Sequence, residues 1–132
     1  MARSASEHPT ELELLILKVL WNEAPLPVRD IRQALARAGR DLAHTTVITT
    51  LNVMVRKKFV RRTMDGKACL FAPRVSREQV SSKMLGDIVD RVFDGSAAAV
   101  VLNLFDQGDL KAEDIKELRQ MLRQKVQQEK SP

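Results

Sequence analysis

Apolar residues recur three and four positions apart over most of the chain, which is the spacing of helices with one buried side. Three helices are expected in the first half, with apolar stripes within residues 12–20, 28–38 and 47–55. Three more are expected in the second half, at about residues 77–93, 96–105 and 112–127. Thr10 with Glu13 and Ser76 with Gln79 have the spacing of capping boxes, so the first and fourth helices should begin just after Thr10 and Ser76.

Between the third and fourth helices the pattern changes to that of a β-hairpin. Residues 59–63 and 68–72 are expected to form two strands, and Asp65-Gly66 between them is typical of a tight turn. Three helices followed by a hairpin is the order of elements in a winged helix-turn-helix. The expected fold class is therefore mainly α with a small β-hairpin wing, divided into a winged helix-turn-helix domain of residues 1–75 and a three-helix module of residues 76–132.

The C-terminal helical module carries more apolar surface than it can bury. Its middle segment, residues 96–105, is apolar almost all round, and three short helices are too small to cover such a surface. Oligomerisation is the natural solution, and we expect a homodimer. The positions expected in the dimer contact are Val80, Met84, Ile88, Val92, Val101, Leu104, Leu118 and Leu122.

The net charge of +5 is distributed unevenly along the 132 residues. Residues 1–75 hold 13 Lys and Arg against 7 Asp and Glu, a net +6, whereas residues 76–132 hold 9 against 10, a net −1. Excess positive charge on one domain is typical of proteins that bind a polyanion such as nucleic acid. A solvated basic surface would have the same composition and is the alternative interpretation.

The third helix, at about residues 44–57, has a polar side rich in threonine. Thr fills four of the six positions from 45 to 50, although its β-branched side chain is unfavourable inside a helix. Thr45, Thr46 and Thr49 lie off the apolar stripe, so core packing does not explain them. In a recognition helix, Thr can bond phosphates or base edges and Asn52 can pair with adenine. A partly exposed helix with neutral polar residues is the alternative.

A run of basic residues after this helix favours contact with double-stranded DNA, because Lys and Arg beside a docked helix would meet phosphates and the minor groove. Lys57 and Lys58 belong to this run and are also expected to contact phosphates. The residues expected to bind DNA are His44, Thr45, Thr46, Thr49, Asn52, Arg56, Arg61, Arg62 and Lys67.

Several segments together resemble one family of regulators. These segments are TELELLILKVLW, LAHTTVITTLNVMVRKKFVRR and VVLNLFDQGDLKAEDIKELRQML, and they extend over about residues 10–125. They resemble the penicillinase-repressor family of BlaI/MecI-like transcriptional repressors. The resemblance implies a homodimeric winged-helix repressor with interlocking C-terminal helices and a short inverted-repeat operator. The chain differs at Val53, where a basic residue is common, at Lys58, where Gly is usual, and at Leu70-Phe71, where an aromatic pair is usual.

The same resemblance implies a way of switching the repressor off. Many members lose DNA affinity when a membrane sensor and protease system cleaves the dimerisation domain. The matching bond in this chain is Asn103–Leu104. Because other members respond to other signals, a purely structural role for Asn103 on a packed helix stays open.

Other classes of function have little support in the sequence. There is no stretch of 18 apolar residues and no apolar leader, so we expect a cytoplasmic protein that is not inserted in a membrane. No catalytic constellation stands out, and His44 has no second ligand at metal-binding spacing, so we expect neither an enzyme nor a cofactor. The competing hypotheses are a winged-helix module that binds proteins rather than DNA, and an accessory protein of a nucleic-acid enzyme or a small metalloregulator.

Overall fold

The computed structural model describes residues 8–108 and 110–130. The chain falls into two compact units, Met1–Leu85 and Gly86–Pro132, and each is described by itself. The first unit thus ends inside a helix, ten residues after the expected domain boundary at residue 75. The boundary expected at residue 75 stays a prediction.

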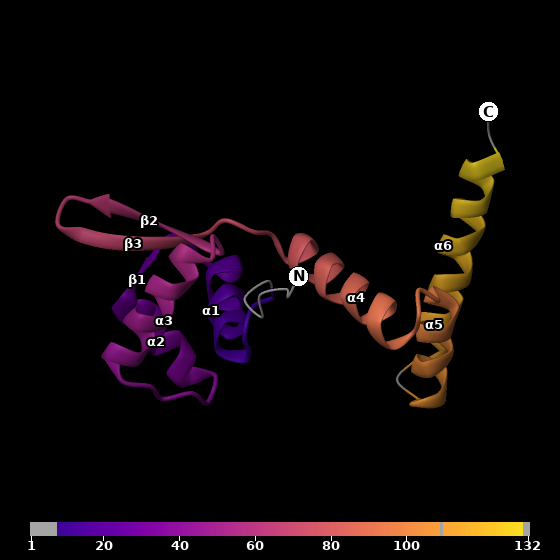
Figure 1. Cartoon of the computed structure of the whole chain (residues 1–132), viewed down its shortest axis with the longest axis horizontal. Helices are drawn as coiled ribbons and strands as arrows, with labels where there is room; N and C mark the ends of the chain where they lie inside the picture. Colours follow the sequence, from indigo (N-terminus) through magenta and orange to yellow (C-terminus); the bar gives the residue numbers. More distant parts are fainter. Residues whose placement is uncertain (1–7, 109, 131–132) are drawn as a thin grey trace. The chain divides into compact units, whose positions relative to one another are not determined.

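The first unit has the expected order of elements, with one addition (Figure 1). Its elements are α1 (Glu11–Asn22), β1 (Leu26–Pro27), α2 (Val28–Arg37), α3 (His44–Arg56), β2 (Val60–Asp65), β3 (Ala68–Pro73) and the start of α4 (Arg77–Val92). Both predicted capping boxes are present. The Thr10 hydroxyl accepts from the Glu13 N–H at 3.2 Å, and the Ser76 hydroxyl accepts from the Gln79 N–H at 3.0 Å.

The sheet has three antiparallel strands in the order β1-β3-β2. The predicted hairpin is confirmed, with Asp65 opposite Ala68 and a left-handed backbone at Gly66, where φ is +64°. The strand β1 was not predicted. It places Leu26 opposite Phe71 and Pro27 opposite Leu70, and Pro27 is tolerated there because β1 is an edge strand.

The apolar stripes of the first three helices meet beneath this small sheet. The core contains Ile16, Leu17, Leu20, Leu26, Ile31, Leu35, Val47, Leu51, Met54, Phe59, Val60, Phe71 and Val80. The hairpin of β2 and β3 projects beyond the helices, as expected for a wing (Figure 1). The mainly helical winged helix with an additional C-terminal helical module is therefore confirmed.

The link between β3 and α4 is held against the end of α1. Trp21 donates its indole N–H to the backbone carbonyl of Val75 at 2.8 Å. The guanidinium of Arg77 lies 4.9 Å from the centre of the Trp21 ring, within the range of a cation–π contact. Trp21 therefore joins the first helix to the chain that follows the wing.

The second unit contains the rest of α4, then α5 (Ala97–Asp106) and α6 (Ala112–Lys130). Among its described residues in α5 and α6, none is buried, although both helices carry large apolar side chains. Within residues 8–108 and 110–130, no helix combines the length and the apolar character needed to cross a membrane.

Candidate nucleic-acid interface

One side of α3 presents only exposed polar side chains. Thr45, Thr49, Asn52 and Arg56 follow one another at intervals of four, three and four residues, which places them on one side of a helix. All four are exposed. The buried residues on the opposite side of α3 are Val47, Leu51 and Met54. The packing of the apolar side against α1 and α2 therefore turns a continuous polar surface toward solvent.

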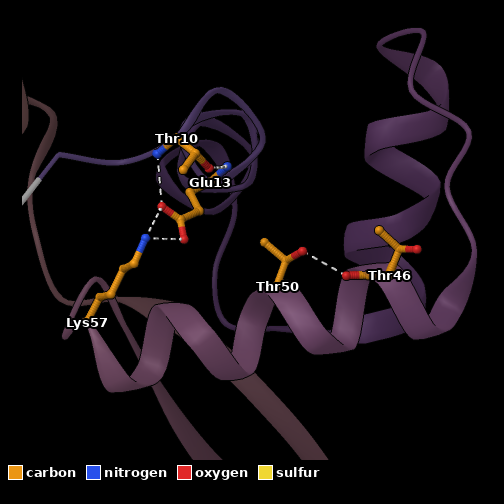
Figure 2. A network of polar contacts seen from close by, with 5 residues as sticks. All are labelled: Thr10, Glu13, Thr46, Thr50 and Lys57. Atoms are coloured by element: carbon orange, nitrogen blue, oxygen red, sulfur yellow. Dashed lines mark hydrogen bonds and ion pairs between the residues drawn. The ribbon is translucent and has the colours of Figure 1, made fainter. Parts of the chain in front are cut away.

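Two threonines lie to the side of this surface. Thr50 is half-buried and donates its hydroxyl to the backbone carbonyl of Thr46 at 2.8 Å (Figure 2). Such a bond within the helix uses the Thr50 hydroxyl for local structure. Thr46 is exposed in the first turn of α3, at the edge of the polar surface. The four threonines thus have different surroundings, and Thr50, which was not expected to bind DNA, is the one whose hydroxyl bonds within the helix.

The start of α3 offers backbone donors beside these side chains. Ala43 is the N-cap residue, and within the described chain no side chain caps this end. The first N–H groups of a helix have no partner inside the helix and can bond phosphate oxygens. His44 and Thr45 therefore add exposed side chains at an end of α3 where backbone donors are available.

The end of α3 is fixed by an ion pair that the sequence did not predict. The Lys57 ammonium lies 2.9 Å from Oε2 and 3.1 Å from Oε1 of Glu13, in the first turn of α1 (Figure 2). We expected Lys57 to contact phosphates, and in this structure its ammonium is paired with the Glu13 carboxylate. Its contact with DNA stays a prediction. The pair joins residues 44 positions apart, and no local pattern signals it.

Lys58 behaves differently from its neighbour. It is exposed, and its backbone is left-handed, with φ of +69°. This conformation is unfavourable for a side chain with a Cβ atom by about 1–2 kcal/mol. It allows the chain to turn from α3 toward β2, and just before β2 the Phe59 N–H bonds the carbonyl of Met54 at 2.9 Å.

The wing exposes the remaining predicted basic residues. Arg61, Arg62 and Lys67 are all exposed, and Lys67 lies in the turn between β2 and β3. Because successive side chains of a strand point to opposite faces, Arg61 and Arg62 leave β2 on different faces. Every one of the nine residues expected to bind DNA is therefore on the surface of the first unit. Their contact with DNA stays a prediction.

The residues expected in a dimer contact divide into two groups. Val80 belongs to the buried core of the first unit and is covered by its own chain, and Met84 is half-buried against that core. The others are exposed on the helices of the second unit, with Ile88 at 45% and Leu122 at 63% of full exposure. These others are Ile88, Val92, Val101, Leu104, Leu118 and Leu122.

The described residues hold no group of three His, Cys, Asp or Glu side chains placed to bind a metal ion. His44 instead lies exposed in the first turn of α3. The chemistry of this surface is that of hydroxyl, amide and cationic groups, which suits phosphates and base edges.

Comparison with known proteins agrees with this fold. The model of the penicillinase repressor family matches residues 9–124. Transcriptional regulator BlaI of Mycobacterium tuberculosis is 31% identical over 99 residues, which are 74% of this chain and 71% of the relative. Methicillin resistance regulatory protein MecI of Staphylococcus aureus is 23% identical over 110 residues, 83% of this chain and 89% of the relative. Penicillinase repressor of Bacillus licheniformis is 21% identical over 113 residues, 86% of this chain and 88% of the relative. The chain therefore belongs to the penicillinase repressor family.

Proposed function

We propose that the chain is a homodimeric transcriptional repressor that binds an inverted-repeat operator in double-stranded DNA. The observation that carries the proposal is the exposed polar side of α3, formed by Thr45, Thr49, Asn52 and Arg56. A helix in the major groove needs such hydroxyl, amide and guanidinium groups, because they bond base edges and phosphates. The names of the relatives, which are regulators and repressors of transcription, support the same function.

The basic wing supports DNA as the partner. Arg61, Arg62 and Lys67 give the first unit exposed cations beyond the end of α3. Cations beside a docked helix neutralise phosphates, which strengthens binding to any sequence and makes affinity fall with salt. In this proposal α3 supplies the sequence preference and the wing supplies much of the general affinity.

The exposed apolar side chains of the second unit support a dimer. Ile88, Val101 and Leu122 are large apolar residues left in contact with solvent. Contiguous exposed apolar surface marks contacts between proteins. A second copy of the chain would cover this surface and would bring a second α3 to the operator, so two half-sites could be bound together.

The proposal is tested by selection from a pool of random duplexes at fixed salt, followed by sequencing of the bound fraction. We expect an inverted repeat whose half-sites are about one helical turn, or 10 base pairs, apart. The matched control is the chain with Thr49→Ala and Asn52→Ala, which should bind weakly and enrich no motif. Failure of the unaltered chain to enrich any sequence would favour a protein-binding winged helix instead.

We further propose that cleavage of the Asn103–Leu104 bond inactivates the repressor. Both residues are exposed on α5, and the Asn103 side chain accepts a bond from the Gln107 amide at 2.8 Å. A cut in the middle of α5 would divide the proposed dimerisation module and weaken dimers. A monomer binds only one half-site, so operator affinity should fall by on the order of 10²–10⁴-fold. The membrane sensor and protease expected from the family would be the agent.

An engineered cut tests this second step without the natural protease. A recognition site for a specific protease is inserted between residues 103 and 104, and the same chain is compared before and after digestion. We expect dimers that bind the selected duplex before the cut and monomers that bind it weakly afterwards. Dimers that survive the cut with full affinity would contradict inactivation by cleavage.

A further inference from the structure

Glu13 is a buried carboxylate in the first turn of α1 with three polar contacts. Its side chain is only 4% exposed. It accepts from the Thr10 backbone N–H at 2.9 Å, and both of its oxygens accept from the Lys57 ammonium (Figure 2). From the sequence, Glu13 was expected only to complete the capping box with Thr10. The structure gives it a second role between two helices.

Lys57 contacts both Glu13 and the ring of Phe59. Its side chain is 19% exposed, and its ammonium lies 5.9 Å from the centre of the buried Phe59 ring, in addition to its contact with Glu13. The residue is the C-cap of α3, directly after Arg56. Movement of the end of α3 away from α1 would therefore separate the buried Glu13 carboxylate from its half-buried cation, which is unfavourable.

The contact of Lys57 with Glu13 ties the C-terminal end of α3 to α1 and adds to the apolar packing that sets which side of α3 faces solvent. Neighbouring residues on a helix differ by about 100° around its axis. Lys57 reaches Glu13 in α1, whereas the line of Arg56, Asn52 and Thr49 lies about 100° around the helix from Lys57 and is exposed. Apolar packing of Val47, Leu51 and Met54 also restricts this rotation, and the ion pair adds a polar contact at the C-terminal end of α3, beyond the last of these core residues.

We propose that Glu13 is a positioning residue for DNA recognition, which rests on the proposed function. By binding Lys57 it fixes the rotation of α3 about its axis, and it withholds the charge of Lys57 from phosphates. Both effects favour sequence preference over general affinity. Rotation determines which side chains reach base edges, and each additional phosphate contact strengthens binding to all sequences alike.

The test uses three variants of the full chain. Glu13→Gln keeps the capping acceptor, since Gln also serves in a capping box, but removes the charge that binds Lys57. Lys57→Met removes the cation and keeps a long side chain against Phe59. Glu11→Gln is the matched control, because it makes the same change of net charge on the same helix. Glu11 is 87% exposed and pairs with Arg40 at 3.2 Å.

Affinity is measured against the duplex selected by the unaltered chain and against a random duplex of the same length, over a series of salt concentrations. We expect Glu13→Gln to lower the ratio of specific to random affinity by on the order of tenfold. We also expect it to steepen the salt dependence on the random duplex by about 0.9, since the freed Lys57 gains a phosphate. Lys57→Met should lower the ratio and leave the salt dependence unchanged, and Glu11→Gln should change neither.

A merely structural pair would give a different result. Both variants would then melt at lower temperature, yet the folded protein would keep the unaltered ratio and salt dependence, and this result would overturn the proposal. If Glu13→Gln does not fold, the ratio of specific to random affinity of Lys57→Met decides between a positioning role and a merely structural pair. If the unaltered chain enriches no sequence in the selection, the proposed function itself is contradicted. This outcome is known before any variant is compared.

Discussion

The two units of this chain use apolar residues in opposite ways. In the first unit the apolar side chains of three helices and a small sheet enclose one another, and Ile16, Leu51 and Phe71 are fully buried. In the second unit, among the residues described in α5 and α6, none is buried, and Leu102 and Leu122 are more than half exposed. The first unit completes its core within one chain, and the second does not.

The difference shows which property each unit can supply alone. A closed core leaves the surface of the first unit free to carry polar and cationic groups, as α3 and the wing do. From the open apolar surface of the second unit we expect its stability to depend on another molecule. We therefore expect stability and base reading to belong to the first unit, and assembly to belong to the second.

Removal of the largest core side chain should have the greatest effect. Phe71 is fully buried on β3 between the sheet and the helices. Phe71→Ala should lower the free energy of unfolding by about 3–5 kcal/mol, through lost burial and the cavity left behind. Urea denaturation followed by circular dichroism measures this change. A loss below about 1 kcal/mol would mean that the first unit does not depend on its own core.

A charge placed on the exposed apolar surface should separate assembly from folding. Ile88→Asp should give monomers and lower operator affinity by on the order of 10²-fold or more, because two half-sites are no longer bound together. The first unit should unfold at an unchanged urea concentration. Sedimentation and DNA titration measure the two effects, and Lys116→Ala at an exposed polar position of α6 is the control. A surviving dimer would place the contact elsewhere.

Loss of one base-reading side chain should have a smaller effect. Asn52→Ala should weaken binding to the selected duplex by about 1–3 kcal/mol and leave binding to random DNA almost unchanged. Thr50→Ala is the matched control, because the Thr50 hydroxyl already bonds the carbonyl of Thr46. Equal weakening on both duplexes would show that Asn52 contributes no sequence preference.

Relief of backbone strain should stabilise the first unit. Lys58→Gly should raise its free energy of unfolding by about 1 kcal/mol, because glycine adopts the left-handed conformation found at this position without a Cβ clash. Lys58→Ala removes the charge and keeps the strain, so it should not stabilise the fold. Denaturation curves of the two variants compare these outcomes. Equal stability of both would mean that the backbone at residue 58 is relaxed.

Loss of one cation at the wing tip should have the smallest effect. Lys67→Ala should weaken binding to all duplexes severalfold and reduce the slope of log affinity against log salt by about 0.9, the value for one phosphate contact. Lys18→Ala, an exposed lysine on α1, should leave the slope unchanged. An unchanged slope for Lys67→Ala would remove the wing tip from the DNA contact.

Local patterns in the sequence predicted most of the first unit. The capping box of Thr10 and Glu13, the apolar positions of α3 and the hairpin turn at Gly66 each depend on residues close together in the chain. Their spacing is therefore visible without a structure. The exposed side of α3 followed from the same pattern, because residues off an apolar stripe face solvent when the stripe is buried.

Features that depend on distant residues could not be predicted in this way. The strand β1 has two residues, one of them Pro27, and it exists because β3 offers it a partner. The pair of Glu13 and Lys57 depends on how α1 packs across α3. Val80 continues the apolar stripe of α4, and only the packed structure shows that the core of the first unit covers it.

The placement of Trp21 has a practical consequence for spectroscopy. The chain has one tryptophan and no tyrosine, and the indole is bonded to Val75 and covered by Arg77 within the first unit. Intrinsic fluorescence excited at the indole band therefore reports on the winged helix alone. Assembly or cleavage of the C-terminal module would leave this emission unchanged, whereas loosening of the link from β3 to α4 would alter it.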